Sequence, residues 1–213
     1  MKVELKAITP DSELNIVEIA RVSSSRKDKT QNPEGLLNYL IKNKHWSPFE
    51  HSYLTYEIVT SKAIGIQLLR HRSFTFQEFS QRYSKVEEIE PVELRKQATN
   101  NRQSSTEVID PNEEIFFGEN ETFNEVSSQF FEMCKDFYNY LLQKGVAREC
   151  ARMFLPMATQ TTIYMTGSIR SWIHFLEIRD DEHAQKEIQL IAKEIKKSMI
   201  KELPIISKAL NWV

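Results

Sequence analysis

The sequence predicts an α+β fold that is mostly helical, a single domain over residues 1–213 with a small antiparallel or mixed sheet. Several segments carry apolar residues every three or four positions, which is the spacing of an amphipathic helix. Three short segments alternate in polarity or are rich in β-branched residues, as strands are. The chain has 213 residues, 40% of them hydrophobic, which is enough for a core without support from disulfides or metals.

The three strands are expected at residues 2–8, 51–60 and 159–166. The first alternates charged and apolar side chains, and the third is rich in β-branched residues. The apolar face of the second strand consists of Leu54, Tyr56 and Ile58. Such a face predicts that one side of the sheet packs against helices.

Helices are expected around these strands. The first starts at Asp11 or Ser12 and reaches about Val22, with Leu14 facing inward. The second starts near Pro33, where the missing N–H costs little. The others are expected over about 61–70, from 123 to Gly145, over 147–154, from 169 and from 184. The longest has an apolar stripe that we expect to be buried, consisting of Phe123, Val126, Phe130, Met133, Phe137 and Leu141.

Charge and cysteine usage narrow the class of protein. The 28 Lys+Arg nearly balance the 30 Asp+Glu, which argues against a general nucleic-acid coat or a membrane-surface binder. No apolar run approaches the roughly 18 residues of a membrane helix, and the charged start is unlike a signal peptide. Cys134 and Cys150 do not form a disulfide framework, so a reducing, cytoplasmic setting is expected. Residues 85–118 are charged and rich in Asn and Gln, which predicts a surface excursion.

A first concentration of polar groups surrounds the end of the helix expected over 61–70. On that helix Gln67, Arg70 and His71 would share one face, and Arg72 follows at once. The irregular loop after it contains Gln77, Glu78, Ser80, Gln81 and Arg82. Guanidinium forks match phosphate oxygens in shape and charge, so the segment predicts a phosphate-binding loop. The alternative is cations that only stabilise a helix end.

A second concentration, of arginine and histidine, lies nearer the end of the chain: Arg148, Arg152, Arg170, His174, Arg179 and His183. Arg170 and His174 are four positions apart and share a helix face opposite an apolar face. A solvated helix face is the ordinary explanation. Against it, a surface with Arg and His side chains and no acid between them leaves their charge unbalanced. Arg179 is followed by three acids, so an exposed ion pair of little energetic value is the alternative there.

Metal binding is the main alternative for these residues. The chain has five histidines but no H-E-x-x-H and no C-x-x-C spacing, so no metal site is predicted. A metal-dependent nucleotide phosphohydrolase that uses His71, His183 and Asp180 stays an alternative, as does a non-catalytic nucleotide-binding protein. Both cysteines are expected to be buried and inert. With five glycines and no G-x-G-x-x-G, a Rossmann or P-loop nucleotide site is not expected.

Five blocks of the sequence occur in the order of one known family. Arg70-His71-Arg72, seven further residues and Ser80 form the motif R-H-R-x7-S. Residues 45–51 read HWSPFEH, similar to an H-x-[ST]-P-F-E-H segment. The other blocks are residues 20–23, 151–156 and 178–188. On these blocks the chain resembles the flavin-dependent thymidylate synthases from about residue 14 to 200, with 85–118 least alike.

The resemblance implies an activity and an assembly. The family methylates deoxyuridylate (dUMP) at C5 to give thymidylate (dTMP). It uses methylenetetrahydrofolate as carbon donor, flavin adenine dinucleotide (FAD) as hydride carrier and usually NADPH as reductant. Because the hydride comes from the flavin, no enzyme cysteine needs to attack the pyrimidine. The family forms homotetramers whose active sites are built from several subunits.

The resemblance also implies residue roles. Contacts to FAD would come from Ser47, Arg70, His71, Arg72, Glu78, Ser168, Arg170 and His174. Contacts to dUMP would come from Gln67, Arg70, Glu78, Ser80, Gln81, Arg82, Arg152 and Arg179, with Arg152 from a neighbouring subunit. Arg179 would be the catalytic residue that stabilises ionised uracil, a role for which a preorganised charge is worth roughly 3–4 kcal/mol. His45 would lie near the flavin ring and the folate. If the backbone N–H of Gln81 binds phosphate, its φ must be negative.

Overall fold

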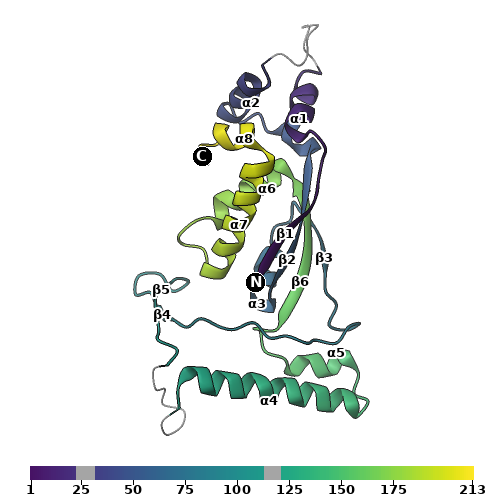
Figure 1. Ribbon diagram of the computed structural model, residues 1–213, viewed down its shortest axis with the longest axis vertical. Helices are drawn as coiled ribbons and strands as arrows, with labels where there is room; N and C mark the ends of the chain where they lie inside the picture. The colour runs from purple at the N-terminus through teal and green to yellow at the C-terminus, as the bar shows by residue number, and fades with distance from the viewer. Residues whose placement is uncertain (23–31, 113–120) are drawn as a thin grey trace. The chain divides into compact units, whose positions relative to one another are not determined.

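The structure is a computed structural model that describes residues 1–22, 32–112 and 121–213 (Figure 1). These residues form two compact units. Unit 1 consists of Met1, Val59–Gln67 and Glu78–Thr162, and unit 2 of Lys2–Ile58, Leu68–Gln77 and Ile163–Val213. Residues 113–118, the last part of the expected 85–118 excursion, lie outside the described residues.

A four-stranded sheet has the order β1-β2-β6-β3. The strands are β1 (Lys2–Ile8), β2 (Tyr53–Ser61), β3 (Thr75–Glu78) and β6 (Gln160–Ser168). Side chains of β2 alternate strictly between buried and half-exposed after Tyr53, with Leu54, Tyr56 and Ile58 fully buried. The three strands expected from the sequence are therefore confirmed, while β3 was not expected.

Unit 2 places helices against this sheet. They are α1 (Ser12–Ala20), α2 (Pro33–Lys42), the 3-10 helix η1 (Ser47–His51), α6 (Ile169–Arg179), α7 (Lys186–Glu202) and α8 (Pro204–Ala209). Helix α7 packs on β1 and α6, and α8 packs on α2 and α7 (Figure 1). The centre of the core is aromatic: the Trp172 ring lies 5.0 Å from that of Tyr56 and 4.6 Å from that of Phe74. The Trp172 indole N–H is satisfied by the carbonyl of Leu54 at 3.1 Å, so the polar atom of this buried ring has a partner.

Unit 1 is built around one long helix. Its elements are α3 (Lys62–Leu68, of which Leu68 belongs to unit 2), β4 (Arg95–Gln97), β5 (Ser105–Val108), α4 (Phe123–Gln143), α5 (Arg148–Ala151) and η2 (Arg152–Phe154). A capping box between Thr122 and Glu125 starts α4, and Gly145 at φ 78° follows its end. Strands β4 and β5 form an antiparallel pair inside the segment expected to be a surface excursion.

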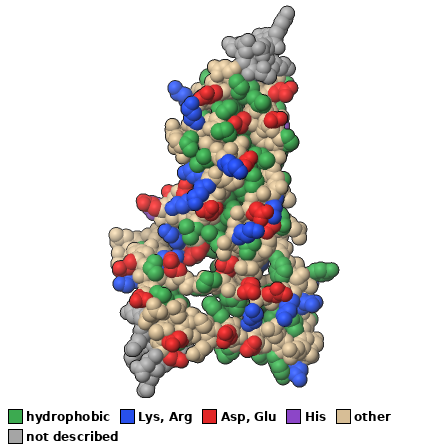
Figure 2. All heavy atoms as spheres, in the orientation of Figure 1, with side chains coloured by type: hydrophobic (Ala, Val, Ile, Leu, Met, Phe, Trp, Pro, Cys, Tyr) green, Lys and Arg blue, Asp and Glu red, His purple; other side chains and the backbone are tan. Residues whose placement is uncertain are grey.

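The prediction that the apolar stripe of α4 is buried is wrong for the central residues of that stripe. Phe130, Met133 and Phe137 are 48%, 61% and 43% exposed, and Tyr138 is the buried residue of this helix. Hydrophobic side chains are visible over α4 in Figure 2. Periodicity identified the apolar face correctly but could not say what covers it. In unit 1, Tyr138 packs with Val86 and Ala151 instead.

Two smaller expectations are also wrong. Leu14 is 49% exposed, because Ile16 and Val17 form the buried face of α1. Cys150 is exposed and Cys134 half-buried, so neither is the buried thiol that was expected. On the face drawn in Figure 2, basic and acidic side chains are intermixed, in keeping with their nearly equal numbers. In the described parts of the chain no helix has the length and apolar character to cross a membrane.

Candidate active site

The Arg70-His71-Arg72 segment lies in a turn and not on a helix. Helix α3 ends at Leu68, whose carbonyl accepts the N–H of His71 at 3.1 Å. The prediction that Gln67, Arg70 and His71 share one face of a helix is therefore wrong. The turn leaves the side chains of Arg70 and Arg72 exposed and that of His71 half-buried. Two guanidinium groups are thus presented to solvent beside an imidazole that is fixed by packing.

His71 is joined to the end of α6. The Nε–H of Arg179 donates to Nε2 of His71 at 2.9 Å, although the two residues are 108 positions apart. The imidazole lies edge-on to Phe175, with ring centroids 4.9 Å apart, and near Phe74 at 6.2 Å. Two of the resembling blocks, the R-H-R motif and the Ile178–Ile188 block, therefore meet in unit 2.

The environment of His71 keeps its ring neutral. Burial, and then the nearby charges of Arg179 and His174, lower the pKa of His71 to about 4. A neutral imidazole has one acceptor nitrogen, which is what the Arg179 donor requires. Burial also lowers the pKa of Arg179, but an arginine stays charged in proteins. The pair is therefore a cation held by a neutral acceptor.

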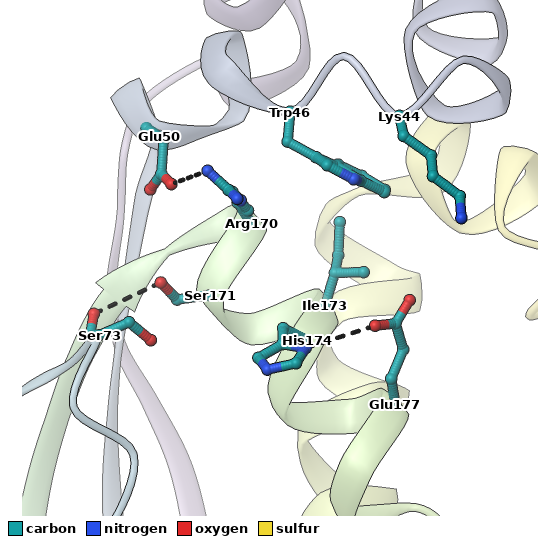
Figure 3. Close-up of a pocket in the computed structure, with 9 residues that line it drawn as sticks. All are labelled: Lys44, Trp46, Glu50, Ser73, Arg170, Ser171, Ile173, His174 and Glu177. Carbon is teal, nitrogen blue, oxygen red and sulfur yellow. Dashed lines mark hydrogen bonds and ion pairs between the residues drawn. The ribbon is translucent and has the colours of Figure 1, made fainter.

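A cleft of about 490 Å³ lies beside the N-terminal half of α6 in unit 2. Figure 3 shows its lining, which consists of Lys44, Trp46, Glu50, Ser73, Arg170, Ser171, Ile173, His174 and Glu177. Arg170 donates to Glu50 at 2.9 Å, and His174 faces Glu177 at 3.6 Å (Figure 3). Arg170 and His174 share the exposed face of α6, as predicted. An aromatic ring beside cationic and hydrogen-bonding groups suits a flat ligand that carries negative charge.

Ser168, Ser47 and His45 were also predicted from the sequence and belong to unit 2. In the sequence they are close to residues that line this cleft. Ser168 is buried and caps α6, since its hydroxyl accepts the N–H of Ser171 at 3.2 Å. Ser47 is the exposed first residue of η1. His45 is exposed, and its ring lies edge-on to Tyr39 at 5.8 Å. Sequence reasoning missed Lys44, Trp46 and Glu50 as lining residues, although the HWSPFEH block contains two of them.

Unit 1 holds a second group of the predicted residues. The Oε1 of Glu78 accepts from Lys62 Nζ at 2.7 Å and from the hydroxyl of Thr161 at 2.9 Å. Gln81 is buried, and it is not among the described residues with positive φ, so the condition on its backbone is met. Gln67, at the end of the α3 segment in unit 1, is half-buried.

Ser80 and Arg82 line a separate open cavity of about 510 Å³ in unit 1. Its other lining residues are Tyr83, Ala147, Arg148 and Glu149. Arg82 pairs with Glu149 at 2.9 Å, and both side chains are more than half exposed. Arg152, in η2, is half-buried. The cavity thus combines a hydroxyl with two guanidinium groups, as a phosphate site does.

The residues of the metal hypothesis each have another partner. His71 accepts from Arg179, and Asp180 pairs with Lys196 at 2.8 Å. His183 contacts Asp181 at 2.8 Å, two residues away in the same loop. In the described ranges no group of three or more His, Cys, Asp or Glu side chains is arranged to hold a metal ion.

Fold and site together define an α+β protein whose exposed arginines suit anionic ligands and whose sequence lacks a glycine-rich nucleotide-binding loop. The family model described as thymidylate synthase complementing protein matches residues 4–205. The chain is 43% identical over 196 residues to a probable flavin-dependent thymidylate synthase of Paramecium bursaria Chlorella virus 1, covering 91% of this chain and 88% of that protein. It is also 43% identical over 193 residues to the flavin-dependent thymidylate synthase of a Synechocystis strain, covering 91% and 86%. The chain belongs to the flavin-dependent thymidylate synthase family.

A solved structure agrees with this membership. The UMP/dUMP methylase PolB from Streptomyces cacaoi, bound with 5-Br dUMP, matches with a TM-score of 0.83 at 28% identity. The match covers 99% of this chain and 94% of that one. The expected fold class, a mostly helical α+β chain with a small sheet, is confirmed.

Proposed function

We propose that this protein catalyses the reductive methylation of dUMP to dTMP, with methylenetetrahydrofolate as carbon donor, FAD as hydride carrier and NADPH as reductant. The observation that carries the proposal is the 2.9 Å hydrogen bond that joins the R-H-R turn to Arg179. It unites in unit 2 the motif implied for flavin binding and the residue implied for catalysis. Relatives at 43% identity that are named flavin-dependent thymidylate synthases support the same reaction.

The residues of unit 2 suit a flavin dinucleotide. The cleft beside α6 offers Arg170, His174 and the ring of Trp46, and the nearby turn offers the exposed Arg70 and Arg72. This donor set fits a ligand with a diphosphate and flat rings. By the family resemblance, the residues that would hold FAD are Ser47, Arg70, His71, Arg72, Glu78, Ser168, Arg170 and His174, all of them in unit 2 except Glu78. When bound, FAD supplies the hydride chemistry, and the protein supplies position and charge.

The nucleotide contacts are the residues that the family resemblance implies: Gln67, Arg70, Glu78, Ser80, Gln81, Arg82, Arg152 and Arg179. Ser80 and Arg82 line one cavity of unit 1, where they suit a phosphate group. Glu78 pairs with Lys62 at 2.7 Å and accepts the hydroxyl of Thr161 at 2.9 Å. By the same resemblance, His45 would lie near the flavin ring and the folate. These groups bind and orient dUMP, which turns an encounter in solution into a fixed geometry.

Arg179 has the catalytic role. The C5 atom of uracil is a weak nucleophile, and a cation at the edge of the pyrimidine favours negative charge there and moves electron density toward C5. Arg179 is half-buried at the end of α6, so solvent screens its charge less than at the surface. Its Nε–H is directed to His71, and this orients the remaining N–H groups. No cysteine nucleophile takes part.

The assembly we propose is a homotetramer with shared active sites, acting in the cytoplasm. The exposed apolar face of α4 supports assembly, since soluble chains rarely leave a row such as Phe130, Met133 and Phe137 open to water. In such an assembly Arg152 reaches the site of a neighbouring subunit. The cytoplasmic setting is supported by two cysteines that form no disulfide.

Absorbance and tritium release test the function. We expect purified or FAD-reconstituted protein to be yellow and to release tritium from 5-tritiated dUMP only with NADPH and methylenetetrahydrofolate. Protein that cannot be reconstituted with FAD would reject the proposal. Phosphate release that depends on a divalent metal would favour the phosphohydrolase, and bound flavin without turnover would favour a non-catalytic member of the fold.

A further inference from the structure

Glu50 links two of the residues that we propose contact FAD. Its Oε2 accepts the hydroxyl of Ser168 at 2.6 Å, and its Oε1 accepts a guanidinium N–H of Arg170 at 2.9 Å. The acid comes from η1, while the other two lie at the start of α6 about 120 residues later in the chain. Figure 3 shows Glu50 and Arg170 facing each other at the edge of the cleft.

The Ser168 contact fixes the carboxylate. Ser168 is buried, and its oxygen also caps α6 by accepting the N–H of Ser171. A hydroxyl has one proton, and the short 2.6 Å contact directs it to Glu50. The carboxylate is therefore attached to a rigid part of unit 2, although its side chain is 41% exposed.

The Arg170 contact uses only part of the guanidinium. One terminal nitrogen binds Glu50, while the side chain stays 51% exposed on the wall of the cleft. A guanidinium has five N–H donors, so the others stay available for a ligand. An arginine that is already held in one rotamer loses less conformational freedom when it binds a ligand.

We propose that Glu50 is a positioning residue, which Ser168 fixes and which aims Arg170 into the cleft for the anionic part of FAD. This inference rests on the proposed function, since FAD is the ligand. It assigns Glu50 a role of its own within the HWSPFEH block.

Two other roles for Glu50 make different predictions. If the carboxylate competed with the phosphates of FAD for Arg170, its removal would tighten FAD binding. If it only stabilised the positive N-terminal end of α6, its removal would lower the melting temperature and leave the FAD affinity of the folded protein unchanged. The affinity of the folded apoprotein therefore separates the three roles.

The experiment measures the dissociation constant of FAD for full-length apoprotein by flavin fluorescence, with circular dichroism to verify folding. Glu50→Ala is expected to weaken binding about tenfold. Glu50→Gln, which keeps one acceptor oxygen, is expected to weaken it by a smaller factor. Glu34→Ala is the matched control, because Glu34 is also a half-exposed acid paired with a cation, Lys208, at 2.7 Å. The control is expected to bind FAD as wild type does.

A double-mutant cycle tests whether Glu50 acts through Arg170. In an Arg170→Ala background, Glu50→Ala is expected to change FAD affinity less than about twofold, since coupled residues are not additive. Unchanged or tighter binding by both Glu50 variants would overturn the inference, and so would a full tenfold effect without Arg170. If Glu50→Ala does not fold, Glu50→Gln decides by the same criteria. Wild-type apoprotein that binds no FAD would instead remove the proposed function, and this inference with it.

Discussion

Arg179 donates its Nε–H to Nε2 of His71 across 2.9 Å, so that a charged guanidinium is oriented by a neutral ring. A carboxylate in the place of His71 would orient the arginine equally well but would offset its charge. The imidazole leaves that charge available to a substrate. The aromatic edges of Phe74 and Phe175 fix the ring, which makes the pair a preorganised cation at the end of α6.

Removal of this cation should abolish most turnover without unfolding the protein. We expect Arg179→Ala to lower kcat by about 100-fold or more, as the loss of one preorganised electrostatic group does. The measurement is tritium release at saturating dUMP together with the melting temperature. Lys197→Ala is the control, because it removes a cation from an exposed pair with Glu194 on α7. Normal turnover by Arg179→Ala would contradict the assignment.

His71 should make stability fall as the pH drops from about 6.5 toward 4. Its ordinary pKa of 6.5 applies to the unfolded chain, and burial lowers the pKa in the folded protein to about 4. Between these values the unfolded state binds more protons, so the free energy of unfolding decreases with falling pH. We expect His71→Gln to lose less stability than wild type between pH 7 and pH 5, measured by urea unfolding.

His183 provides the control for this measurement. Its contact with Asp181 raises the pKa of His183, so it contributes stability that is present at low pH and is lost as the pH rises. His183→Gln should therefore leave the acid sensitivity of the wild type in place or increase it. Equal losses in wild type and His71→Gln between pH 7 and pH 5 would show that His71 is not held neutral.

Local sequence patterns predicted the fold better than the site. The alternation of Leu54, Tyr56 and Ile58 follows from the two-residue period of a strand, and the structure buries all three. The same reasoning extended α3 to Arg70, because no local signal marks the turn after Leu68. The contact between His71 and Arg179 joins residues 108 positions apart, and no local period encodes such a pairing.

Lys62 should prove important for nucleotide binding through Glu78. Its ammonium contacts Glu78 at 2.7 Å, and the two side chains are 29% and 20% exposed, so the pair is shielded from solvent. Lys62→Met would leave a carboxylate with Thr161 as its remaining partner among these contacts. We expect a loss of about 1–2 kcal/mol in the free energy of unfolding, between the values of surface and buried pairs. We also expect dUMP binding about fivefold weaker, measured by calorimetry.

Lys96→Met is the matched control for Lys62→Met. Lys96 pairs with Glu107 at 3.1 Å in the same unit, but its side chain is 59% exposed and that of Glu107 is 70% exposed. A screened pair of this kind contributes little, so stability and dUMP affinity should stay at wild-type values. Equal effects of the two substitutions would mean that the contact of Lys62 with Glu78 has no special role.

The apolar face of α4 should control the assembly state. Met133 is 61% exposed at the centre of the row formed with Phe130 and Phe137, so a charge there costs the isolated chain little. In an assembly that buries this row, the same charge would be desolvated without a partner, which is strongly unfavourable. We therefore expect Met133→Glu to lower the mass measured by light scattering from about four times the 25.0 kDa chain to that of a smaller species. Glu132→Gln, next to it on the polar side of α4, should leave the mass unchanged. A Met133→Glu protein that keeps the wild-type mass would show that this face is not an interface.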